Sequence, residues 1–469
     1  ARSWKKHARP LLKLNSWAEQ KESTSLKPTL CTRYTSGSTP GKLIKTDSMS
    51  KDTSYPKYRY VILAAFMMIT VAIEIQWLTH AAVARPAELF YGGQFNPESF
   101  LNIDFLAMIY MVAFLVMSFP ASYVIDTYGI RTGLAIGAIL LALFSLMKAA
   151  FADSFTGVVI AQTGLAIAQP FILNGVTAVT ARWFPLYERG MAAGLLALAQ
   201  YIGIIIAMLI TPMLVGSDPS QSDYGSGFGR MLWIYGIISV VAAFSSLLLI
   251  RNRESDGEDE GDVRYTFGKG IRHILMNRDM RITMFLFLIG LGIFNAISSM
   301  TDSIAERVGV EDSDGLIGGV MLIGGIIGAV VIPTLSDKYQ RRKPFLVLCI
   351  AGMLPAVAAL AFAGHLANDP ESIYRISLAA SFTLGFFVMS AGPLGFQYAA
   401  EISYPAPEST SQGILLWVGQ LTGMIFVAGM SIRENQYLGI FMNIFVILAV
   451  LALIGTLILR ESHFMESKK

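Results

Sequence analysis

Twelve apolar stretches, each about 20 residues long, dominate the chain and restrict what it can fold into. At 1.5 Å per residue, a helix of this length crosses a hydrocarbon core about 30 Å thick. Only helices or closed barrels satisfy their backbone polar groups in lipid, and these stretches lack the alternation of barrel strands. The sequence therefore predicts an all-α membrane protein with twelve transmembrane helices, at approximately 61–83, 103–125, 133–152, 157–178, 190–215, 231–250, 282–300, 315–335, 344–364, 375–399, 412–430 and 438–459.

The composition and the placement of charge agree with a membrane protein. Of the residues, 15% are charged and 54% are hydrophobic, whereas soluble domains contain roughly 25% charged and 45–50% apolar residues. Lysines and arginines are concentrated in alternate connections, and the positive-inside rule places these connections and both termini in the cytoplasm. We expect a monomer in the lipid bilayer of the plasma membrane. Nucleic-acid binding is not expected, because the cations lie at helix ends and not on one folded face.

The chain divides into two halves of six helices. Its longest internal polar stretch, 251–281, follows the sixth apolar stretch and contains an acidic block from Glu254 to Asp262. We interpret it as a cytoplasmic linker with a short amphipathic helix near 268–278. The predicted organisation is a disordered N-terminal tail (1–58), an N-terminal bundle (59–250), this linker, a C-terminal bundle (282–460) and a C-terminal tail (461–469).

The first 48 residues differ from the rest of the chain. They are basic and rich in Ser, Thr and Lys, and they lack the apolar segment of a signal peptide. From Met49 onward, "MSKDTSYPKYRYVILAAF" resembles a natural start. We interpret residues 1–48 as a disordered tail or as sequence added upstream of that start, with a transit peptide as the alternative.

Matching motifs follow equivalent helices in the two halves. "SYVIDTYGIRTG" after the second stretch and "PTLSDKYQRRKP" after the eighth each contain an aspartate followed by basic residues. "RWFPLYERG" after the fourth and "ISYPAPEST" after the tenth share an aromatic-Pro-x-x-Glu pattern. Parallel repeats about an axis along the membrane normal recur among transporters. The repetition therefore favours two pseudo-symmetric bundles.

The aspartate loops resemble the signature of the major facilitator superfamily, Gly-x-x-x-Asp-Arg/Lys-x-Gly-Arg-Arg/Lys. The match is incomplete, because Ser122 and Pro333 replace the first glycine, Thr127 replaces the usual cation, and Gln340 replaces the second glycine in the second copy. In that family the aspartate meets a neighbouring helix end and basic groups, and latches the cytoplasmic face while the transporter is open outward. The resemblance implies the major facilitator fold and gating by the two aspartates with basic residues near them. The complete set of predicted gating residues is Asp126, Arg131, Arg189, Asp337, Arg341 and Glu401.

Glu401 ends an apolar run in "GFQYAAEISYPAPESTSQG". Pro405 and Pro407 stop the helix that carries it, and the hydroxyls at 409–411 can cap the next helix. Two interpretations of Glu401 stay open. It either extends to water or a neighbouring helix end, or acts as a gate residue that holds the inner face closed.

That stretch, together with "FLAMIYMVAFLVMSFPASYVIDTYGIR", "AIAQPFILNGVTAVTARWFP" and "EIQWL", resembles the feline-leukaemia-virus-subgroup-C-receptor-related family. The resemblance covers most of 59–430 and is absent from 1–50. The family includes choline and ethanolamine transporters, long discussed as haem carriers, and a lysosomal pyridoxine carrier. The resemblance therefore implies a transporter of a small organic solute, and an amine or vitamin-like substrate.

The first apolar stretch contains the polar residues Glu74, Gln76, Trp77 and His80. Polar side chains in membrane helices are costly and usually face a cavity or another helix. Glu74 and Trp77 are one turn apart and share a face, while Gln76 and His80 form a neighbouring pair. A carboxylate with an indole π-face suits a small organic cation, or a protonatable group that couples transport to protons. The alternatives are a neutral buried Glu74 and a Trp77 that only packs.

The family resemblance adds further substrate-binding candidates. It implies that Trp77 lines the substrate cavity and that Gln169 contacts the substrate. Phe294 or Asn295 stands where the family has a tyrosine on the seventh helix, so an aromatic cage would be incomplete. Other polar residues are expected to line the cavity or to join helices, and Lys148 is expected to extend to the membrane surface. The complete set of predicted substrate-binding residues is Glu74, Gln76, Trp77, Gln169, Asn174, Asn295, Phe294 and Gln397.

The sequence favours a secondary or facilitative transporter that works by alternating access. The alternatives are a proton-coupled transporter of a carboxylate or drug, with Glu74 as coupling group, and a receptor or sensor that does not transport. An enzyme is not expected, because the chain lacks HExxH, GxSxG and paired histidines on one helix. No metal or cofactor is predicted. Haem fits poorly, since only His80 lies near a central stretch and neither cysteine is placed as an axial ligand.

Overall fold

The computed structural model describes residues 57–95, 101–103, 105–216, 224–251, 265–310, 316–430 and 436–462. The N-terminal tail up to residue 56, the acidic block of the linker and the C-terminal tail from residue 463 lie outside these ranges. The described chain is helical. Its elements are α1 (Arg59–Leu78), η1 (Ala81–Val83), α2 (Ala84–Phe90), α3 (Phe105–Tyr128), α4 (Ile130–Ala150), α5 (Phe155–Leu173), α6 (Val176–Trp183), α7 (Arg189–Leu214), α8 (Phe228–Leu249), α9 (Phe267–Met276), α10 (Arg278–Ser299), α11 (Thr301–Arg307), α12 (Leu316–Tyr339), α13 (Lys343–Leu366), α14 (Pro370–Ile402), α15 (Glu408–Met430) and α16 (Leu438–Ile458).

Twelve helical segments in this part of the chain are long and apolar enough to cross a membrane, which confirms the predicted number. Eleven are single helices, and the fourth combines α5 and α6 over Phe155–Trp183. The amphipathic helix expected near 268–278 corresponds to α9. Several spans extend past the predicted apolar stretches. The longest, α14, has 33 residues and begins where Asp369 accepts a hydrogen bond from the Ser372 amide, with Pro370 in its first turn.

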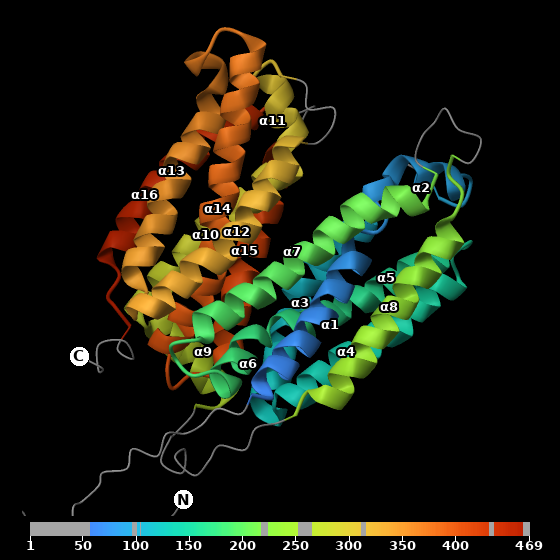
Figure 1. Ribbon diagram of the computed structural model, residues 1–469, viewed down its shortest axis with the longest axis horizontal. Coiled ribbons are helices and arrows are strands. Elements are labelled where there is room, and N and C mark those ends of the chain that lie inside the picture. The colour runs from blue at the N-terminus through green and yellow to red at the C-terminus, as the bar shows by residue number, and fades with distance from the viewer. Residues whose placement is uncertain are drawn as a thin grey trace, which may run out of the picture. The chain divides into compact units, whose positions relative to one another are not determined.

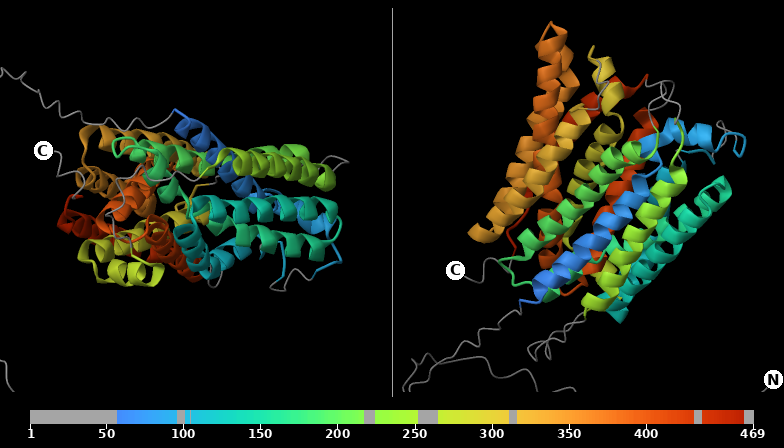
Figure 2. Two further views of the ribbon diagram at one scale, coloured as in Figure 1. Left: turned by 90° about the horizontal axis from the view of Figure 1, so that it is seen from below. Right: turned by 45° about the vertical axis from the view of Figure 1, so that its right-hand side comes forward.

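The spans form two groups, each with its own buried core. α1 and α3–α8 pack together in one group, and α10 and α12–α16 pack in the other (Figures 1 and 2). Apolar clusters fill both groups, with Phe66 and Leu141 among the buried residues of the first and Leu384 and Phe445 among those of the second. Each half therefore buries its own apolar side chains, and the contact between halves is a separate interface.

Close packing of α12 on α14 depends on glycine. A Cβ atom at Gly328 would lie 2.0 Å from the Phe386 carbonyl oxygen, and one at Gly385 would lie 1.8 Å from the Met321 carbonyl oxygen. Small residues of this kind let helix backbones approach in membranes, where van der Waals contact drives helix association. The glycine-rich run around residue 324 is thus a packing seam, as its place within an apolar stretch indicates.

Replacing Gly385 by alanine should destabilise the C-terminal half. The added methyl group would collide with backbone, which cannot move like a flexible side chain, and overpacking of this kind costs about 1–3 kcal/mol. Gly392→Ala is the matched control, because a Cβ atom there meets nothing within 4 Å on the same helix. Thermal unfolding can be followed by thiol labelling of the buried Cys349 in a Cys31→Ser background. Equal melting temperatures for the two variants would contradict the packing seam.

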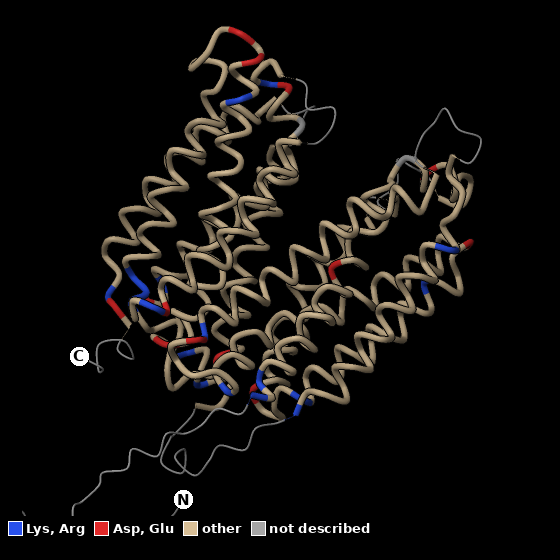
Figure 3. Tube along the Cα trace, viewed as in Figure 1, with Lys and Arg blue, Asp and Glu red and all other residues tan. Residues whose placement is uncertain are grey.

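The two groups meet at one end. In Figure 1 they converge where α6 and α9 lie and diverge towards α2 and α11. Most of the hydrogen bonds seen between the halves in the described ranges lie towards the C-terminal ends of α3, α5, α12 and α14, in α6, or near the N-terminal ends of α7 and α15. One lies further along the helices, where the Trp417 indole N–H of α15 donates to the Leu115 carbonyl oxygen of α3 at 2.9 Å. Figure 3 shows many of the lysines and arginines gathered at this end. We refer to it as the latch end.

Candidate functional site

The first contact of the latch end joins α3 to α15. Asp126, in the last turn of α3, accepts hydrogen bonds from the hydroxyl groups of Ser409 and Thr410 in the first turn of α15. One turn earlier on α3, the Ser122 hydroxyl donates to the Ser409 carbonyl oxygen at 3.1 Å. A carboxylate at a helix N-terminus is favoured by the unpaired amides and the dipole of that helix. The predicted gating aspartate of the first half therefore lies against the second half.

The second contact contains a buried ion trio. The Arg342 guanidinium, 0% exposed, lies 2.5 Å from an Asp337 carboxylate oxygen and 3.0 Å from a Glu401 carboxylate oxygen. The other Asp337 oxygen accepts the backbone amide of Met191, in the first turn of α7, at 2.7 Å. Burial lowers the pKa of Arg342, but the attraction of Glu401 and Asp337 outweighs it and raises that pKa above its ordinary value. The guanidinium stays charged, and the predicted gating residues Asp337 and Glu401 share it.

Amide side chains fill the space between the two contacts. Gln412 of α15 accepts from the Thr177 amide and hydroxyl of α6, both at 2.8 Å. Gln397 of α14 donates to the Thr180 hydroxyl at 2.7 Å. Asn174 donates to the Ser118 hydroxyl on α3, next to the close approach of α15. The structure thus places Asn174 and Gln397, which the sequence assigned to substrate binding, at the latch end.

The cation of the second contact is Arg342, whereas the sequence placed the neighbouring Arg341 there. The side chain of Arg341 is exposed. The repeat contained a signal for this residue, because Arg342 follows Asp337 by five positions, as Arg131 follows Asp126. The backbone repeats as well: Gly129 has φ 90° and its counterpart Gln340 has φ 53°. Gln340 takes this left-handed conformation while its side chain donates to the Asp337 carbonyl oxygen at 2.7 Å.

The other two predicted gating cations lie at helix ends of the first half. Arg131 is exposed in the first turn of α4. Arg189 donates to the carbonyl oxygens of Phe184 and Ala181, at 3.1 and 2.7 Å, and so binds the C-terminal end of α6. Basic groups at a helix C-terminus are stabilising through the helix dipole.

Arg342→Gln should destabilise the C-terminal half strongly, because it leaves two buried carboxylates without their counter-charge. Breaking a buried ion pair by removing one partner costs about 3–5 kcal/mol. Arg341→Gln is the control. It removes the same charge from the neighbouring position, where the side chain is exposed, and should change stability by no more than about 0.5 kcal/mol. Thermal unfolding of the two variants, with thiol labelling of Cys349 as the signal, makes the comparison. A larger loss for Arg341→Gln would refute the assignment.

The second candidate site lies on α1, between the two ends of the N-terminal bundle. Glu74 is 0% exposed, and one of its oxygens accepts the side-chain amides of Gln200 on α7, at 3.2 Å, and Gln169 on α5, at 3.4 Å. The other oxygen has no hydrogen-bond partner, and no basic group of the described residues pairs with Glu74. Gly203 lets α7 approach closely, since a Cβ atom there would lie 2.7 Å from that of Glu74.

Aromatic side chains surround this carboxylate. Trp77, one turn along α1, is half-buried, and its ring lies 6.3 Å from that of Tyr110 on α3. The indole N–H donates to the Ala107 carbonyl oxygen at 3.1 Å, which fixes its polar edge on α3. Tyr110 and Tyr201 lie within electrostatic range of Glu74, and the buried Tyr110 hydroxyl has no partner in the described chain. The structure therefore brings together Glu74, Trp77 and Gln169, as the sequence predicts for a binding site.

Gln76 points into a different part of the bundle. Its amide donates to the Ser239 hydroxyl of α8 at 3.1 Å, and its carbonyl oxygens accept the Lys148 ammonium of α4 at 3.2 and 3.3 Å. Gln162 donates to the backbone oxygens of Gln76 and Trp77, both at 3.2 Å. The expectation that Lys148 extends to the membrane surface is wrong, because the side chain is 0% exposed and binds the C-terminal end of α1. That helix end supplies the negative partial charge for the ammonium.

The remaining candidates of the sequence are spread over both halves. His80 is buried, stacks on Phe228 at 6.3 Å, and has no partner for either ring nitrogen in the described chain. On α10, Asn295 lies 3.5 Å from Gln420 of α15, and Phe294 is half-buried in the C-terminal bundle. The structure does not bring these residues into contact with Glu74 through any hydrogen bond in the described ranges.

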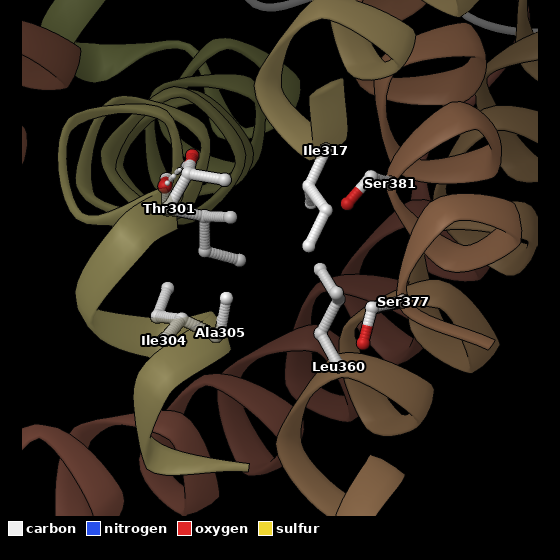
Figure 4. A pocket seen from close by; sticks show the side chains of 8 residues that line it. Thr301, Ile304, Ala305, Ile317, Leu360, Ser377 and Ser381 are labelled. Carbon is white, nitrogen blue, oxygen red and sulfur yellow. Dashed lines mark hydrogen bonds between the residues drawn. The ribbon is translucent and has the colours of Figure 1, made fainter. Parts of the chain in front are cut away.

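A small pocket in the C-terminal bundle is separate from both candidate sites. Figure 4 shows Thr301, Ser377 and Ser381 among its lining, with Ile304, Ile317 and Leu360. These residues belong to α10–α14 of one half, so the pocket does not lie between the halves. The Ser377 hydroxyl is buried without a partner in the described chain. Its mainly apolar lining offers no charge to a solute.

Two bundles of six membrane spans, joined through paired aspartate contacts, define a membrane transporter fold. Residues 60–427 match the family described as Major Facilitator Superfamily. The chain belongs to this family and is a transporter. The solved structures show the same fold: FucP in its outward conformation has a TM-score of 0.67 and 14% identity, covering 87% of this chain and 99% of FucP. The proton:xylose symporter XylE has a TM-score of 0.67 and 15% identity, over 86% of this chain and 96% of XylE.

Curated relatives confirm the narrower resemblance. Solute carrier family 49 member A3 of Xenopus tropicalis is 27% identical over 79% of this chain and 77% of the relative. The choline/ethanolamine transporter FLVCR1 of Felis catus is 26% identical over 83% of this chain and 70% of the relative. The choline/ethanolamine transporter flvcr2b of Danio rerio is 26% identical over 87% of this chain and 84% of the relative. These similarities run through both bundles.

Proposed function

We propose that the chain transports a small organic cation, of the amine type represented by choline and ethanolamine, by alternating access. The observation that carries the proposal is the carboxylate of Glu74, which is fully buried on α1 and has one oxygen without a partner in the described chain. The names of the FLVCR1 and flvcr2b relatives agree with a cationic substrate.

The energetic argument starts from the cost of a buried charge. A carboxylate in an apolar bundle needs a counter-charge or a proton, because removal from water costs several kcal/mol per ion (order of magnitude). Gln169 and Gln200 supply neutral donors to one oxygen only. Arg342 satisfies the corresponding need of Glu401 and Asp337, whereas the described chain supplies Glu74 with no cation. A cationic substrate would provide the missing charge.

The aromatic surroundings support the same substrate class. A cation over the face of tryptophan or tyrosine gains about 0.5–2 kcal/mol, most when desolvated. Trp77 and Tyr110 lie next to Glu74, with the indole N–H already bound to backbone. In the proposed site Glu74 and Trp77 bind the cation and Gln169 orients it. Asn295 and Phe294 contribute from α10, while Gln76, Asn174 and Gln397 act indirectly by holding helices in place.

The latch residues would provide the gate of this transporter. In the proposal, Asp126 and Asp337 hold the halves together at the latch end through the contacts described above, and Glu401 supports Asp337 by sharing the Arg342 guanidinium. Arg131, Arg189 and Arg341 lie at neighbouring helix ends. The positive-inside rule puts this end in the cytoplasm, together with both termini. The arrangement then corresponds to an outward-facing state. We extend the proposal to a monomer in the plasma membrane.

A second candidate function rests on the same unpartnered oxygen. A proton can neutralise Glu74 as well as a substrate cation can, and in this second function Glu74 couples proton movement to the transport of another solute, a carboxylate or a drug. The two functions differ in what replaces the missing charge, and they are separable by experiment.

A screen of small amines by thermal shift should find stabilisation by choline or ethanolamine. A ligand at 100 times its Kd stabilises the folded state by about 2.7 kcal/mol. Trp77→Ala should weaken binding by about tenfold, through loss of the cation–π contact. Trp233→Ala is the control, because that tryptophan is 47% exposed on α8. Equal binding by wild type and Trp77→Ala would remove Trp77 from the site.

Glu74→Gln distinguishes the two candidate functions. If the substrate is a cation, uptake into proteoliposomes should fall by roughly 10- to 100-fold at every pH, since a charged hydrogen-bond partner is lost. If Glu74 couples protons, transport should instead persist but lose its response to an imposed pH gradient. Glu88→Gln, at an exposed position on α2, is the control. Transport that is unchanged in rate and in pH response would exclude Glu74 from both roles.

A further inference from the structure

α9 has an exposed face that combines cations with large apolar side chains. Lys269 and Arg272 lie on it, with Leu275 48% exposed and Met276 69% exposed. At 100° per residue these four side chains share one side of the helix, and the buried Gly270 and Ile274 lie on the other. A face turned only to water does not expose two large apolar side chains next to each other. Helices that lie in a membrane interface do.

The cationic surface continues onto the next helix. Arg278 and Arg281, in the first turn of α10, are exposed as well. None of the four cations has an ion-pair partner among the described residues. α10 is a candidate membrane span that begins at Arg278, so Arg278 and Arg281 are expected near the lipid headgroups. We use the term basic face for Lys269, Arg272, Arg278 and Arg281 together with Leu275 and Met276.

The opposite side of α9 holds the segment between the two latch contacts. A Cβ atom at Gly270 would lie 2.7 Å from Pro407, and the Tyr265 amide donates to the Pro405 carbonyl oxygen at 3.1 Å. The Asn277 side chain donates to the Ile402 carbonyl oxygen at 2.9 Å. These bonds enclose residues 402–407, between Glu401 of the ion trio and Ser409 of the Asp126 contact.

α9 also reaches the first half. The ring of Phe267, its first residue, lies 5.3 Å from the ring of Tyr123 on α3, one turn before Asp126. The helix therefore touches both α3 and α15, the two helices that the Asp126 contact joins, and separation of the halves would break the contact of Phe267 with Tyr123.

We propose that the basic face binds the headgroups of anionic lipids in the leaflet at the latch end, and that this binding favours the closed latch. The cations attract the headgroups, and Leu275 and Met276 enter the acyl boundary. The acidic block of the linker, "ESDGEDEGD", carries the opposite charge to the basic face but has no apolar side chain to cover Leu275 and Met276. An anionic lipid offers both a negative headgroup for the cations and acyl chains for the two apolar side chains. The proposal does not depend on which solute is carried.

The first test measures lipid preference in the full chain, reconstituted in phosphatidylcholine vesicles that contain phosphatidylserine. Electron paramagnetic resonance of spin-labelled lipids gives the preference for phosphatidylserine over phosphatidylcholine. Lys269→Gln with Arg272→Gln should lower this preference by about fivefold or more, because each cation near the surface contributes about 1 kcal/mol. Lys57→Gln with Lys338→Gln removes the same charge from exposed positions outside the basic face and should leave it unchanged. An equal loss in both variants would overturn the proposal.

Two further variants separate lipid from other occupants. Leu275→Ser with Met276→Ser keeps every charge and should also lower the preference if the apolar side chains enter the bilayer. Neutralising the acidic block should leave the preference unchanged. A preference that appears only after this neutralisation would assign the basic face to the acidic block and overturn the lipid assignment.

The link to the latch is tested by crosslinking. Thr180→Cys and Gln397→Cys, whose native side chains are 2.7 Å apart across the halves, report closure in a Cys31→Ser background. Phosphatidylserine should raise the crosslinking yield in this reporter and not in the reporter with Lys269→Gln and Arg272→Gln. A yield that does not respond to phosphatidylserine in either protein would refute the effect on the latch, whether or not any solute is transported.

Discussion

A charge inside an apolar bundle must be matched there, and the structure meets this constraint most fully around Arg342. The guanidinium lies between Asp337 and Glu401, and the amide of Met191 satisfies the remaining Asp337 oxygen. Because two acidic groups share one cation, a helix N-terminus from the other half completes the balance. The need to satisfy buried charge thus sets where α7 meets α12, and with it the position at which the two bundles close.

Glu74 is also a buried ionisable group, but the described chain supplies it with no counter-charge. It is as deeply buried as Arg342, but two neutral amides and aromatic rings surround it, and one oxygen stays without a partner in the described chain. Lys148 of α4 and Gln162 of α5 donate to the backbone oxygen of Gln76, near the C-terminal end of α1. Neither of them donates to Glu74 in the described chain. Glu401 also has one buried oxygen without a hydrogen-bond partner in the described chain, but Arg342 neutralises its charge. Glu74 has no such cation among the described residues and is therefore available to a cationic ligand or a proton.

The sequence predicts the twelve spans, the two halves and both latch aspartates, because apolar length and a repeated motif survive without three-dimensional information. It does not predict which way each helix faces. In a span that is apolar all round, the pattern does not mark the buried side. For this reason Gln76 and Gln397, assigned to substrate binding, contact Lys148 and Thr180, and Arg342 becomes apparent only when the two motifs are aligned by their aspartates. The pairing of Glu74 with Gln200 needs the tertiary contact of α1 with α7.

The glycine seam between α12 and α14 has a consequence for how this transporter changes state. Gly328 and Gly385 lock these helices backbone to backbone, and all three members of the ion trio are attached to the same half. When the halves separate, the salt bridges travel as one rigid piece. The groups exchanged for water around the two latch aspartates are neutral donors, the Met191 amide and the hydroxyls that face Asp126. In the alternating-access mechanism proposed above, separation of the halves would leave the three charges of this trio together, which lowers the energetic cost of opening at this contact.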